Sequence, residues 1–446
     1  RMRTMGVMRS RAILAALGVL WAGAADAAVL TAEEAVKIAL MKNTQIINSQ
    51  AGVLESRGRV LGAYGALLPT FSGALTREDS RTDGSFGPQL IAGRLLSGPP
   101  TDSRANGSST SLSSSWGILT PSSWADLSSA RHSLRASRFE LGATRNDVAL
   151  ATRRQFYEVV KAIRLADVAG GALKLARDDE RRIRAMFEVG SVSKSDLLKA
   201  QVRTAQSEFD EIAARNLVVV QRIGLAGQIG VKESALGEVD TVLTVEPRTY
   251  DEATVTAEAS RNRPDLMAAE ATLKAARAAH SAARLSRLPF VTMGGSATFN
   301  SRTFTTVFDT TTARGFDKSV GARIAINWNI FDLRLADAQI AGARARLDRA
   351  REAHDALQRN LQGEVHQQLL AYNEAVEQDK VAQRGLESAV ENLKLTQEKY
   401  KVGSATILEL IDAQVQLQTA QSNVVRALAA IRVAEAQIDR VRGHGE

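Results

Sequence analysis

The chain contains no cysteine, which excludes disulfide bonds, thiolate metal sites and a lipid-modified cysteine at a signal cleavage site. Only 5% of its 446 residues are aromatic, whereas alanine is abundant, and this balance favours tightly packed helices over a large globular interior. Only eight prolines occur, and none lies at 122–246 or after 289. Two long stretches are therefore free to be helical throughout.

The segment 1–27 has the pattern of a secretory signal peptide. Four arginines accompany an apolar segment at 12–23, and Ala25-Asp26-Ala27 supplies small residues for cleavage. An apolar segment of twelve residues is shorter than the about 20 that a transmembrane helix needs. We predict cleavage before Ala28, and a retained N-terminal anchor is the alternative. No later apolar run is longer, so any membrane crossing would have to be made by strands.

Charge and motif content exclude several function classes. Without the segment 1–27 the net charge falls from +8 to about +5, and the charges are interspersed, so we expect no nucleic-acid partner. The five histidines are scattered, and neither a glycine-rich phosphate loop nor a nucleophile elbow is present. We therefore expect no catalytic residue, no metal site and no cofactor, and we interpret the protein as a non-enzyme.

An internal repeat divides the chain. Residues 188–203 (EVGSVSKSDLLKAQVR) and 401–416 (KVGSATILELIDAQVQ) lie 213 positions apart and are identical at seven of sixteen positions. Residues 31–46 correspond to residues 251–266 at an offset of 220. Each half thus contains a helix, a strand, a loop, a strand, a long helix, a tip and a returning helix. The predicted divisions are a signal peptide at 1–27, a first structural repeat at 28–245 and a second at 246–446.

Strand-like segments occur as one pair in each half. From Val320 to Ile330 the even positions are apolar and the odd positions small or polar, which predicts a strand with one apolar face. Residues 111–119 show a weaker form, in which Trp116 corresponds to Trp328. A length near ten with an aromatic near the end fits a transmembrane β-strand. A half-exposed strand of a soluble sheet is the alternative. Mobile surface loops are expected within the pairs, at 80–109 and 302–318.

Two proline-free segments, about 125–187 and 333–400, predict helices roughly 95–100 Å long. No globular core holds a helix of that length, so each belongs to a coiled coil or a tube wall. Gly190 and Gly403 are predicted to end these helices, because glycine tolerates the left-handed backbone of a helix C-terminus. Ser193 or Ser195 in the first half, and Thr406 in the second, are candidate N-caps of the returning helices.

Together these features resemble the TolC family of outer-membrane efflux channels. The motifs that carry the resemblance are EEAVKIALMKN at 33–43, the Leu-Pro before each strand pair, NWNIFD at 327–332 and YKVGSATILELIDAQ at 400–414. The resemblance covers nearly all of the chain after position 27. It implies a mainly α-helical fold with long coiled-coil hairpins and four transmembrane β-strands per chain. Because the smallest membrane barrels need about eight strands, several chains must share one barrel. The resemblance implies three chains that form an α-barrel/β-barrel tunnel.

The resemblance also assigns site residues. The turns that meet the hairpin of a periplasmic adaptor correspond to Val189, Gly190, Ser191, Val402, Gly403 and Ser404. Glu409 and Asp412 correspond to paired acidic residues that narrow the periplasmic entrance. Three copies would ring six carboxylates, favour cations and make closure sensitive to pH and divalent ions. Spacing alone interprets the two acids as ordinary residues in the first turns of a helix. Trp116 and Trp328 are the candidate barrel aromatics.

Links between hairpins that hold a closed state are assigned by resemblance to Tyr400, Ser195 and Asp196. The family has a basic partner two residues after Gly403, where this chain has Ala405, so that salt bridge cannot form in the same way. The candidate substitutes are Lys194 and Lys199.

The function implied by the resemblance is a passive, gated exit duct of a tripartite efflux pump or a type I secretion system. Its expected location is the outer membrane of a Gram-negative bacterium, with a periplasmic extension. The implied partners are two further copies of the chain, a periplasmic adaptor protein, an inner-membrane transporter of the RND or ABC type reached through that adaptor, and outer-membrane lipid. The alternatives are a secreted or periplasmic coiled-coil structural protein without pore activity, and the adaptor itself, which has one hairpin rather than two.

Overall fold

A computed structural model describes residues 29–84, 89–91, 94–96, 101–306, 312–332 and 334–444. The predicted signal peptide at 1–27 lies outside the described residues. No helix in the described part of the chain is long and apolar enough to cross a membrane. The chain folds into two compact units. The hairpin unit holds residues up to Ile47, Thr144–Ala259 and those from Gly363 onward, and the strand unit holds Asn48–Ala143 and Ser260–Gln362.

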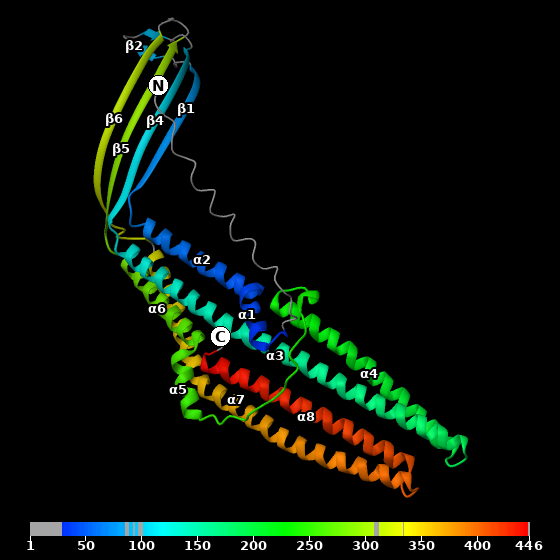
Figure 1. The fold of residues 1–446 in the computed structure, drawn as a ribbon. Helices are drawn as coiled ribbons and strands as arrows, with labels where there is room; N and C mark the ends of the chain where they lie inside the picture. The colour runs from blue at the N-terminus through cyan, green and yellow to red at the C-terminus, as the bar shows by residue number, and fades with distance from the viewer. Residues whose placement is uncertain are drawn as a thin grey trace, which may run out of the picture. The chain divides into compact units, whose positions relative to one another are not determined.

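The same order of elements occurs in both halves of the chain (Figure 1). The first half contains α1 (Ala32–Lys42), α2 (Thr44–Gly65), β1 (Thr70–Gly84), β4 (Thr101–Leu119), α3 (Pro121–Glu188) and α4 (Lys194–Ile229). The second contains α5 (Glu252–Asn262), α6 (Pro264–Leu285), β5 (Phe290–Thr306), β6 (Thr312–Asn327), α7 (Leu335–Lys401) and α8 (Ile407–Arg442). Three short elements, β2 (Gln89–Ile91), β3 (Arg94–Leu96) and the 3-10 helix η1 (Glu233–Ala235), have no counterpart among the described residues.

Corresponding helices have nearly equal lengths. α1 and α5 have 11 residues each, α2 and α6 have 22, α4 and α8 have 36, and α3 and α7 have 68 and 67. The two predicted long helices are confirmed to within four residues at each end. The boundary near position 245 falls between η1 and α5, and the assignment of 28–245 and 246–446 as duplicated modules stays a prediction.

The end of α1 and the end of α4 meet in the hairpin unit. Thr31 and Glu34 form a capping box that fixes the first turn of α1. At the other end, the amide of Asn43 donates from Nδ2 to the carbonyl of Gln228 at 2.8 Å. Gly230 closes α4 with φ +71°, and a Cβ there would lie 2.9 Å from the carbonyl oxygen of Lys42. Only glycine satisfies both the left-handed backbone and this close approach.

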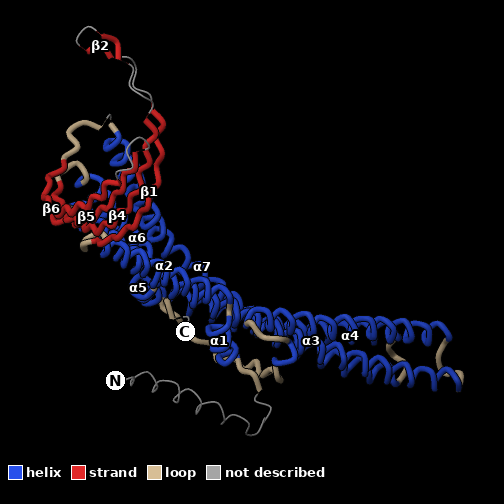
Figure 2. Tube along the Cα trace, turned by 90° about the horizontal axis from the view of Figure 1, so that it is seen from above, coloured by secondary structure: helices blue, strands red, loops and turns tan. Residues whose placement is uncertain are grey.

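Strands β1, β4, β5 and β6 form one antiparallel sheet in that order, and β4–β5 pairing joins the two halves of the chain (Figure 2). Residues that oppose each other across an antiparallel pair share a face, so the register assigns every strand residue to one of two faces. One face carries the large apolar side chains of all four strands. They are Phe71 and Leu75, Leu112 and Trp116, Met293 and Phe299, and Phe316, Val320, Ile324 and Ile326. All of them are exposed in the single chain.

The opposite face of the sheet is polar. Ser72 and Ser113 share a hydrogen bond between their hydroxyls at 2.7 Å, and Asn327 donates from Nδ2 to the hydroxyl of Thr292 at 3.0 Å. Serine occupies four alternate positions of β4 on this face, from position 109 to 115. The alternation predicted from Val320 onward is therefore confirmed as far as Asn327 and extends across the sheet, whereas residues 328–330, which were also predicted as strand, lie beyond the end of β6.

The predicted loops at 80–109 and 302–318 were too long. The structure places residues 80–84 in β1, 101–109 in β4, 302–306 in β5 and 312–318 in β6. Backbone hydrogen bonds of the ladder do not depend on side-chain polarity, so the paired strands continue through Ser-, Thr- and Asp-rich sequence of loop-like composition.

Two corresponding tryptophans fasten the strand ends to the helices that precede the sheet. Trp116 donates from Nε1 to the carbonyl of Leu67 at 3.0 Å, and Trp328 donates to the carbonyl of Arg287 at 3.1 Å. Both acceptors lie in the turn immediately before a Leu-Pro pair. The repeated Trp and the repeated Leu-Pro pair thus belong to one type of contact, a hydrogen bond from the indole to the turn before the Leu-Pro pair, which occurs once in each half.

Candidate functional site

The site predicted from the sequence consists of the tips of the two helical hairpins, α3–α4 and α7–α8. At the first tip Gly190 adopts φ +75° and donates its N–H to Phe187, while Ser191 donates to Met186 at 2.8 Å. At the second tip Gly403 adopts φ +78°, and Ser404 donates to Lys399 at 2.9 Å. Both turns are Schellman motifs, as the predicted role of the two glycines requires.

Substitution Gly403→Ala is expected to destabilise the second tip by about 1–2 kcal/mol, because a Cβ is strained in the left-handed region. Gly385→Ala in the middle of α7 is the matched control. It has open space around it and is expected to stabilise the helix by about 0.5–1 kcal/mol. Hydrogen exchange at the Ser404 amide measures the change at the tip. Equal protection in the two variants would contradict the assigned turn.

Each returning helix begins with a side-chain cap. Ser193 accepts from the N–H of Asp196 at 3.1 Å, and Thr406 accepts from the N–H of Glu409 at 3.2 Å. Glu409 reciprocates by accepting from the N–H of Thr406 at 2.9 Å, which completes a capping box. Both predicted N-caps are confirmed. The capping box also gives Glu409 a structural role that leaves its carboxylate at the surface.

The acidic pair predicted at the entrance lies on the first turns of α8. Glu409 and Asp412 are both exposed in the single chain. Asp412 accepts from Nε2 of Gln416 at 2.6 Å, a contact within the same helix. The hydrogen bonds of both carboxylates are made within the start of α8, and both side chains lie on the exposed side of this helix.

The tips themselves are apolar and exposed. Val189 is 77% exposed and Val402 79% exposed, although each is large enough to be buried in a typical core. They occupy corresponding positions of the repeat, immediately before Gly190 and Gly403. Two exposed valines at the ends of two hairpins are the arrangement expected of a contact surface.

Below the tips an apolar cluster joins the two hairpins. Ile183 of α3, Ala200 of α4 and Leu393 of α7 pack with Ile407, Leu410 and Ala413 of α8. Tyr400 packs against this cluster. All four helices contribute, so the two hairpins of the chain are held together by burial of apolar surface.

A polar layer lies beside this cluster, and the sequence reasoning missed it. Asp179 of α3 has a side chain only 6% exposed, accepts from the amide of Gln414 on α8 and pairs with Arg182 at 3.1 Å. Arg203 of α4 donates to Gln418 of α8 at 2.9 Å. The glutamines lie one turn apart on α8, so one face of this helix bonds to both helices of the other hairpin. The sequence contained one signal for this polar layer, namely the glutamines at otherwise apolar heptad positions of α8.

The predicted hairpin links involve Tyr400, Ser195 and Asp196. Within the described ranges, no hydrogen bond links Tyr400 or Asp196 to the other hairpin. The Tyr400 hydroxyl is buried and has no hydrogen-bond partner among the residues that the structure describes. Burial raises the pKa of Tyr400, and the nearby charges of Asp196 and Asp179 raise it further. Asp196 bonds to Ser193 and pairs with Lys199 at 3.6 Å, within its own helix start. The role of these three residues as hairpin links stays a prediction.

Asp179→Asn is expected to stabilise the joined hairpins at pH 7 by about 0.5–1.5 kcal/mol. The asparagine side chain removes the cost of burying a charge, and its oxygen still accepts a hydrogen bond from Gln414. Burial raises the pKa of Asp179 above its ordinary 3.8, with Arg182 and Gln414 opposing the rise. The folded chain then binds this proton more tightly than the unfolded chain. Stability from Asp179 therefore falls as pH rises from 3.8 through the folded pKa, and the loss persists at neutral pH.

The measurement is amide exchange of α8 as a function of pH. Asp179→Asn should flatten the pH dependence, whereas Asp167→Asn, at an exposed carboxylate about three turns earlier on α3 that pairs with Arg164, should leave it unchanged. A destabilised Asp179→Asn variant at pH 7 would mean that the Arg182 ion pair outweighs the cost of burying the charge.

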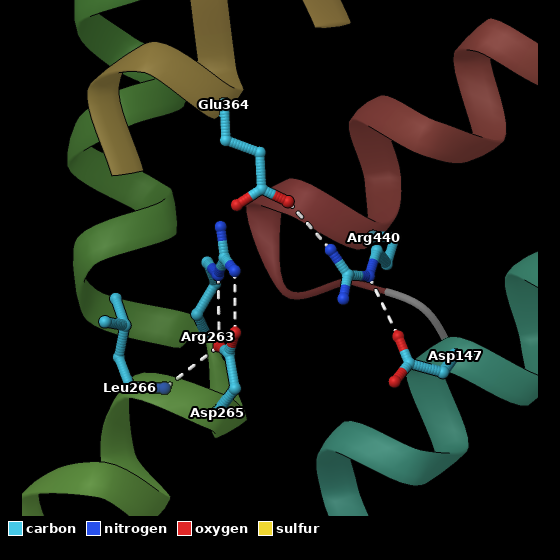
Figure 3. Close-up of polar contacts among 6 residues, drawn as sticks. All are labelled: Asp147, Arg263, Asp265, Leu266, Glu364 and Arg440. Atoms are coloured by element: carbon cyan, nitrogen blue, oxygen red, sulfur yellow. Dashed lines mark hydrogen bonds and ion pairs between the residues drawn. The ribbon is translucent and has the colours of Figure 1, made fainter. Parts of the chain in front are cut away.

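The C-terminal end of α8 is fastened by ion pairs (Figure 3). Arg440 donates from Nε to Asp147 of α3 at 2.9 Å and from a terminal nitrogen to Glu364 of α7 at 2.8 Å. Arg442 donates to Glu258 of α5 at 2.6 Å. Within the strand unit, Arg263 and Asp265 form a separate ion pair at 2.6 Å, and Asp265 also accepts from the N–H of Leu266 (Figure 3). Helix α8 is thus tied to α3, α5 and α7 at the end remote from its tip.

Comparison with known proteins agrees with this architecture. Residues 255–444 match the family model described as outer membrane efflux protein. Over 316 residues the chain is 25% identical to the outer membrane protein TolC of Vibrio cholerae, an alignment that covers 69% of this chain and 70% of that protein. The chain is therefore similar to TolC and, over residues 255–444, to the outer membrane efflux protein family.

Further matches extend the TolC-like likeness in sequence and in fold. Nodulation protein T of Rhizobium leguminosarum bv. trifolii is 25% identical over 267 residues, which cover 57% of this chain and 54% of that protein. The crystal structure of the Campylobacter jejuni CmeC outer membrane channel superposes with a TM-score of 0.79 at 17% identity and covers 93% of this chain and 86% of that one. The predicted fold class, mainly helical with long hairpins and a small antiparallel sheet, is confirmed for this TolC-like chain.

No group of three or more histidine, aspartate or glutamate residues that could hold a metal ion occurs in the described ranges.

Proposed function

We propose that the protein is a passive, gated exit duct in the outer membrane of a Gram-negative bacterium, with its helices extending into the periplasm. It serves a tripartite efflux pump or a type I secretion system. The observation that carries this proposal is the sheet. One face exposes large apolar side chains on all four strands, and the other face is lined by serine, threonine and asparagine.

Such a sheet fits a lipid-facing wall with a wet interior. In water, an exposed apolar face of this extent promotes aggregation. In a bilayer the same face is stable, because it contacts lipid. The outer strands of the four are β1 and β6, and an open sheet edge is not tolerated in lipid. Three copies supply twelve strands, which pair β6 of one copy with β1 of the next and remove every edge. The chain therefore acts as a homotrimer, and Trp116 and Trp328 serve as its barrel aromatics near the end of the strands.

The helical part provides the periplasmic tunnel and its docking surface. Val189, Val402 and the turns that follow them, Gly190-Ser191 and Gly403-Ser404, receive the hairpin of a periplasmic adaptor. The adaptor connects the duct to an inner-membrane transporter of the RND or ABC type, which supplies the energy. The support is the exposure of both tip valines and the identical Schellman geometry of the two turns.

Glu409 and Asp412 form the gate of the duct. Three copies place six carboxylates around the entrance, and the exposure of both residues on the first turns of α8 supports this role. Tyr400, Ser195 and Asp196 act between hairpins when the entrance closes, and the buried, unbonded hydroxyl of Tyr400 supports a partner that the single chain does not supply. The chain is a duplicated module of residues 28–245 and 246–446, and it performs transport rather than catalysis.

A pair of adjacent substitutions in β6 tests the duct. Ile324 lies on the apolar face and Ala325 on the polar face. Ile324→Arg should abolish heat-modifiable migration and outer-membrane fractionation, since a lipid-facing arginine costs about 2–4 kcal/mol at the bilayer midplane. Ala325→Arg should insert normally and form pores in planar bilayers with an altered ion selectivity. Wild-type protein without pores, or insertion of Ile324→Arg as efficient as wild type, would overturn the proposal in favour of a periplasmic coiled-coil protein.

A further inference from the structure

The apolar face of the sheet changes to cationic residues in both edge strands, β1 and β6. The helices join the sheet at the ends where β1 begins and β6 finishes (Figure 1). Counted away from that end, the residue of this face that follows Leu75 on β1 is Arg77. On β6 the residue that follows Val320 is Lys318. Both cations are exposed, so a positive charge marks the end of the apolar surface at each edge of the sheet.

The two middle strands carry hydroxyl groups at the corresponding places. Ser108 of β4 and Ser301 of β5 lie in the same hydrogen-bonded row as Arg77, and Thr110 of β4 lies in the row of Lys318. Hydroxyl, guanidinium and ammonium groups all donate hydrogen bonds to phosphate oxygens, and the charged donors bind most strongly. The strip of the sheet just beyond its apolar surface therefore presents donors to an anion.

The position of Lys318 along its strand matches the edge of a bilayer. Ten residues separate it from Trp328, the candidate barrel aromatic just beyond β6. At about 3.3 Å per residue they span roughly 33 Å, which is about 25 Å of membrane height for a strand tilted by about 40°. The outward apolar band of a membrane barrel is also about 25 Å tall. With Trp328 at the periplasmic boundary of the proposed duct, Lys318 lies at the outer boundary, where lipid headgroups begin.

Lys318 also has the side-chain arrangement of an interfacial residue. Its Nζ lies 5.5 Å from the centre of the Phe299 ring on β5, which belongs to the apolar face. The aliphatic stem thus covers apolar surface while the charge stays at its border, as in long basic side chains at membrane interfaces.

The acidic residues of this face do not cancel the two cations. Asp79 pairs with Arg77 at 3.4 Å, but both side chains are more than half exposed, and such pairs contribute little stability. Arg314 lies in the same hydrogen-bonded row as Asp79 and balances its charge. Farther out, the face carries as many arginines as aspartates, namely Arg81 and Arg104, and Asp83 and Asp102. The positive charge in excess is therefore that of Arg77 and Lys318, next to the apolar surface.

We propose that Arg77 of one copy and Lys318 of the next bind the phosphate groups of a glycolipid in the outer leaflet. Within one chain β1 and β6 are three strand spacings apart, about 14 Å. The β6–β1 pairing of the proposed trimer brings them to a single spacing, so each joint between copies holds one cation pair. The inference rests on the proposed function for this pairing. A lipid with phosphate monoesters fits best, because a monoester carries close to two negative charges at neutral pH.

The site is tested with lipid A, a glycolipid that carries two phosphate monoesters, added to the full chain purified in an uncharged detergent. Native mass spectrometry counts the bound lipid molecules. The variant is Arg77→Gln/Lys318→Gln. The matched control is Arg302→Gln/Arg323→Gln, which removes two exposed cations from the polar face of the same sheet. All four side chains are exposed, so the substitutions leave the packing of the sheet in place.

Wild type and control are expected to bind one lipid A at each joint, and the variant is expected to bind it about tenfold or more weakly, because two charge-assisted contacts are lost. Phosphatidylglycerol, which has a single phosphodiester, should bind more weakly than lipid A. An excess of inorganic phosphate should not displace the lipid, since the apolar surface holds the acyl chains of the lipid and not a free ion.

Equal binding by wild type and variant, an equal loss in the control, phosphatidylglycerol binding as tight as that of lipid A, or displacement by inorganic phosphate would overturn the site. The same preparations are assayed for pores. Pores in wild type together with unchanged lipid A binding in the variant reject this site and leave the proposed duct intact. Wild type that binds lipid A through Arg77 and Lys318 but forms no pores rejects the duct and leaves the lipid site standing.

Discussion

Glu409→Gln together with Asp412→Asn is expected to abolish the cation preference of the pore, with a K⁺/Cl⁻ permeability ratio that falls to about 1, and to raise its conductance. The physical reason is electrostatic. In the proposed trimer six exposed carboxylates ring a narrow entrance, where their fields add and water screens them poorly. Amides of the same shape keep the width of the ring but remove its charge. Single-channel recording in planar bilayers measures both quantities.

Glutamine at position 409 distinguishes an effect on the gate from an effect on helix stability. Glutamine preserves the capping box with Thr406, whereas Glu409→Ala would remove it and cost about 0.5–2 kcal/mol of helix stability. Glu398→Gln is the control, because it neutralises an exposed carboxylate of α7 near the same tip, paired with Lys401. If the double variant conducts like wild type while both form pores, the duct stands and its gate lies elsewhere.

Leu410→Ala is expected to loosen the two hairpins by about 2–4 kcal/mol, since it leaves a cavity where α8 meets α3, α4 and α7. Leu410 is almost fully buried in the apolar cluster that joins the hairpins. A loss of about 3 kcal/mol corresponds to roughly a hundredfold increase in local opening. Native-state hydrogen exchange of the first turns of α8 measures this opening without unfolding the rest of the chain.

Leu408→Ala provides the comparison, because Leu408 lies two residues away on the same helix and is exposed. Its truncation is expected to change protection by less than about 0.5 kcal/mol. Similar effects from the two substitutions would show that the hairpins are not held together through this cluster. In the proposed duct, the Leu410→Ala variant should also flicker between conductance levels more often than wild type.

Local regularities were predictable from the sequence because each depends on a few neighbouring residues. Gly190 and Gly403 end long helices since only glycine enters the left-handed region without strain, and Thr406 caps the next helix through a bond three residues away. The alternation from Val320 to Ile330 indicated a strand face in the same way. The polar segments at 80–84 and 101–109 were misjudged as loops, because strand pairing there is decided by the partner strand rather than by composition.

The sequence by itself determined the element types in each half, the positions of the tips and the polarity of the faces of β4 and β6, because helix and strand periodicities are visible within single segments. Only the tertiary structure decided which polar residues join the hairpins. Asp179 and Gln414 are 235 residues apart, and nothing in either local sequence indicates the other as its partner. The contact exists because burial of the cluster around Leu410 brings α3 and α8 together, and a buried carboxylate then needs the nearest donor.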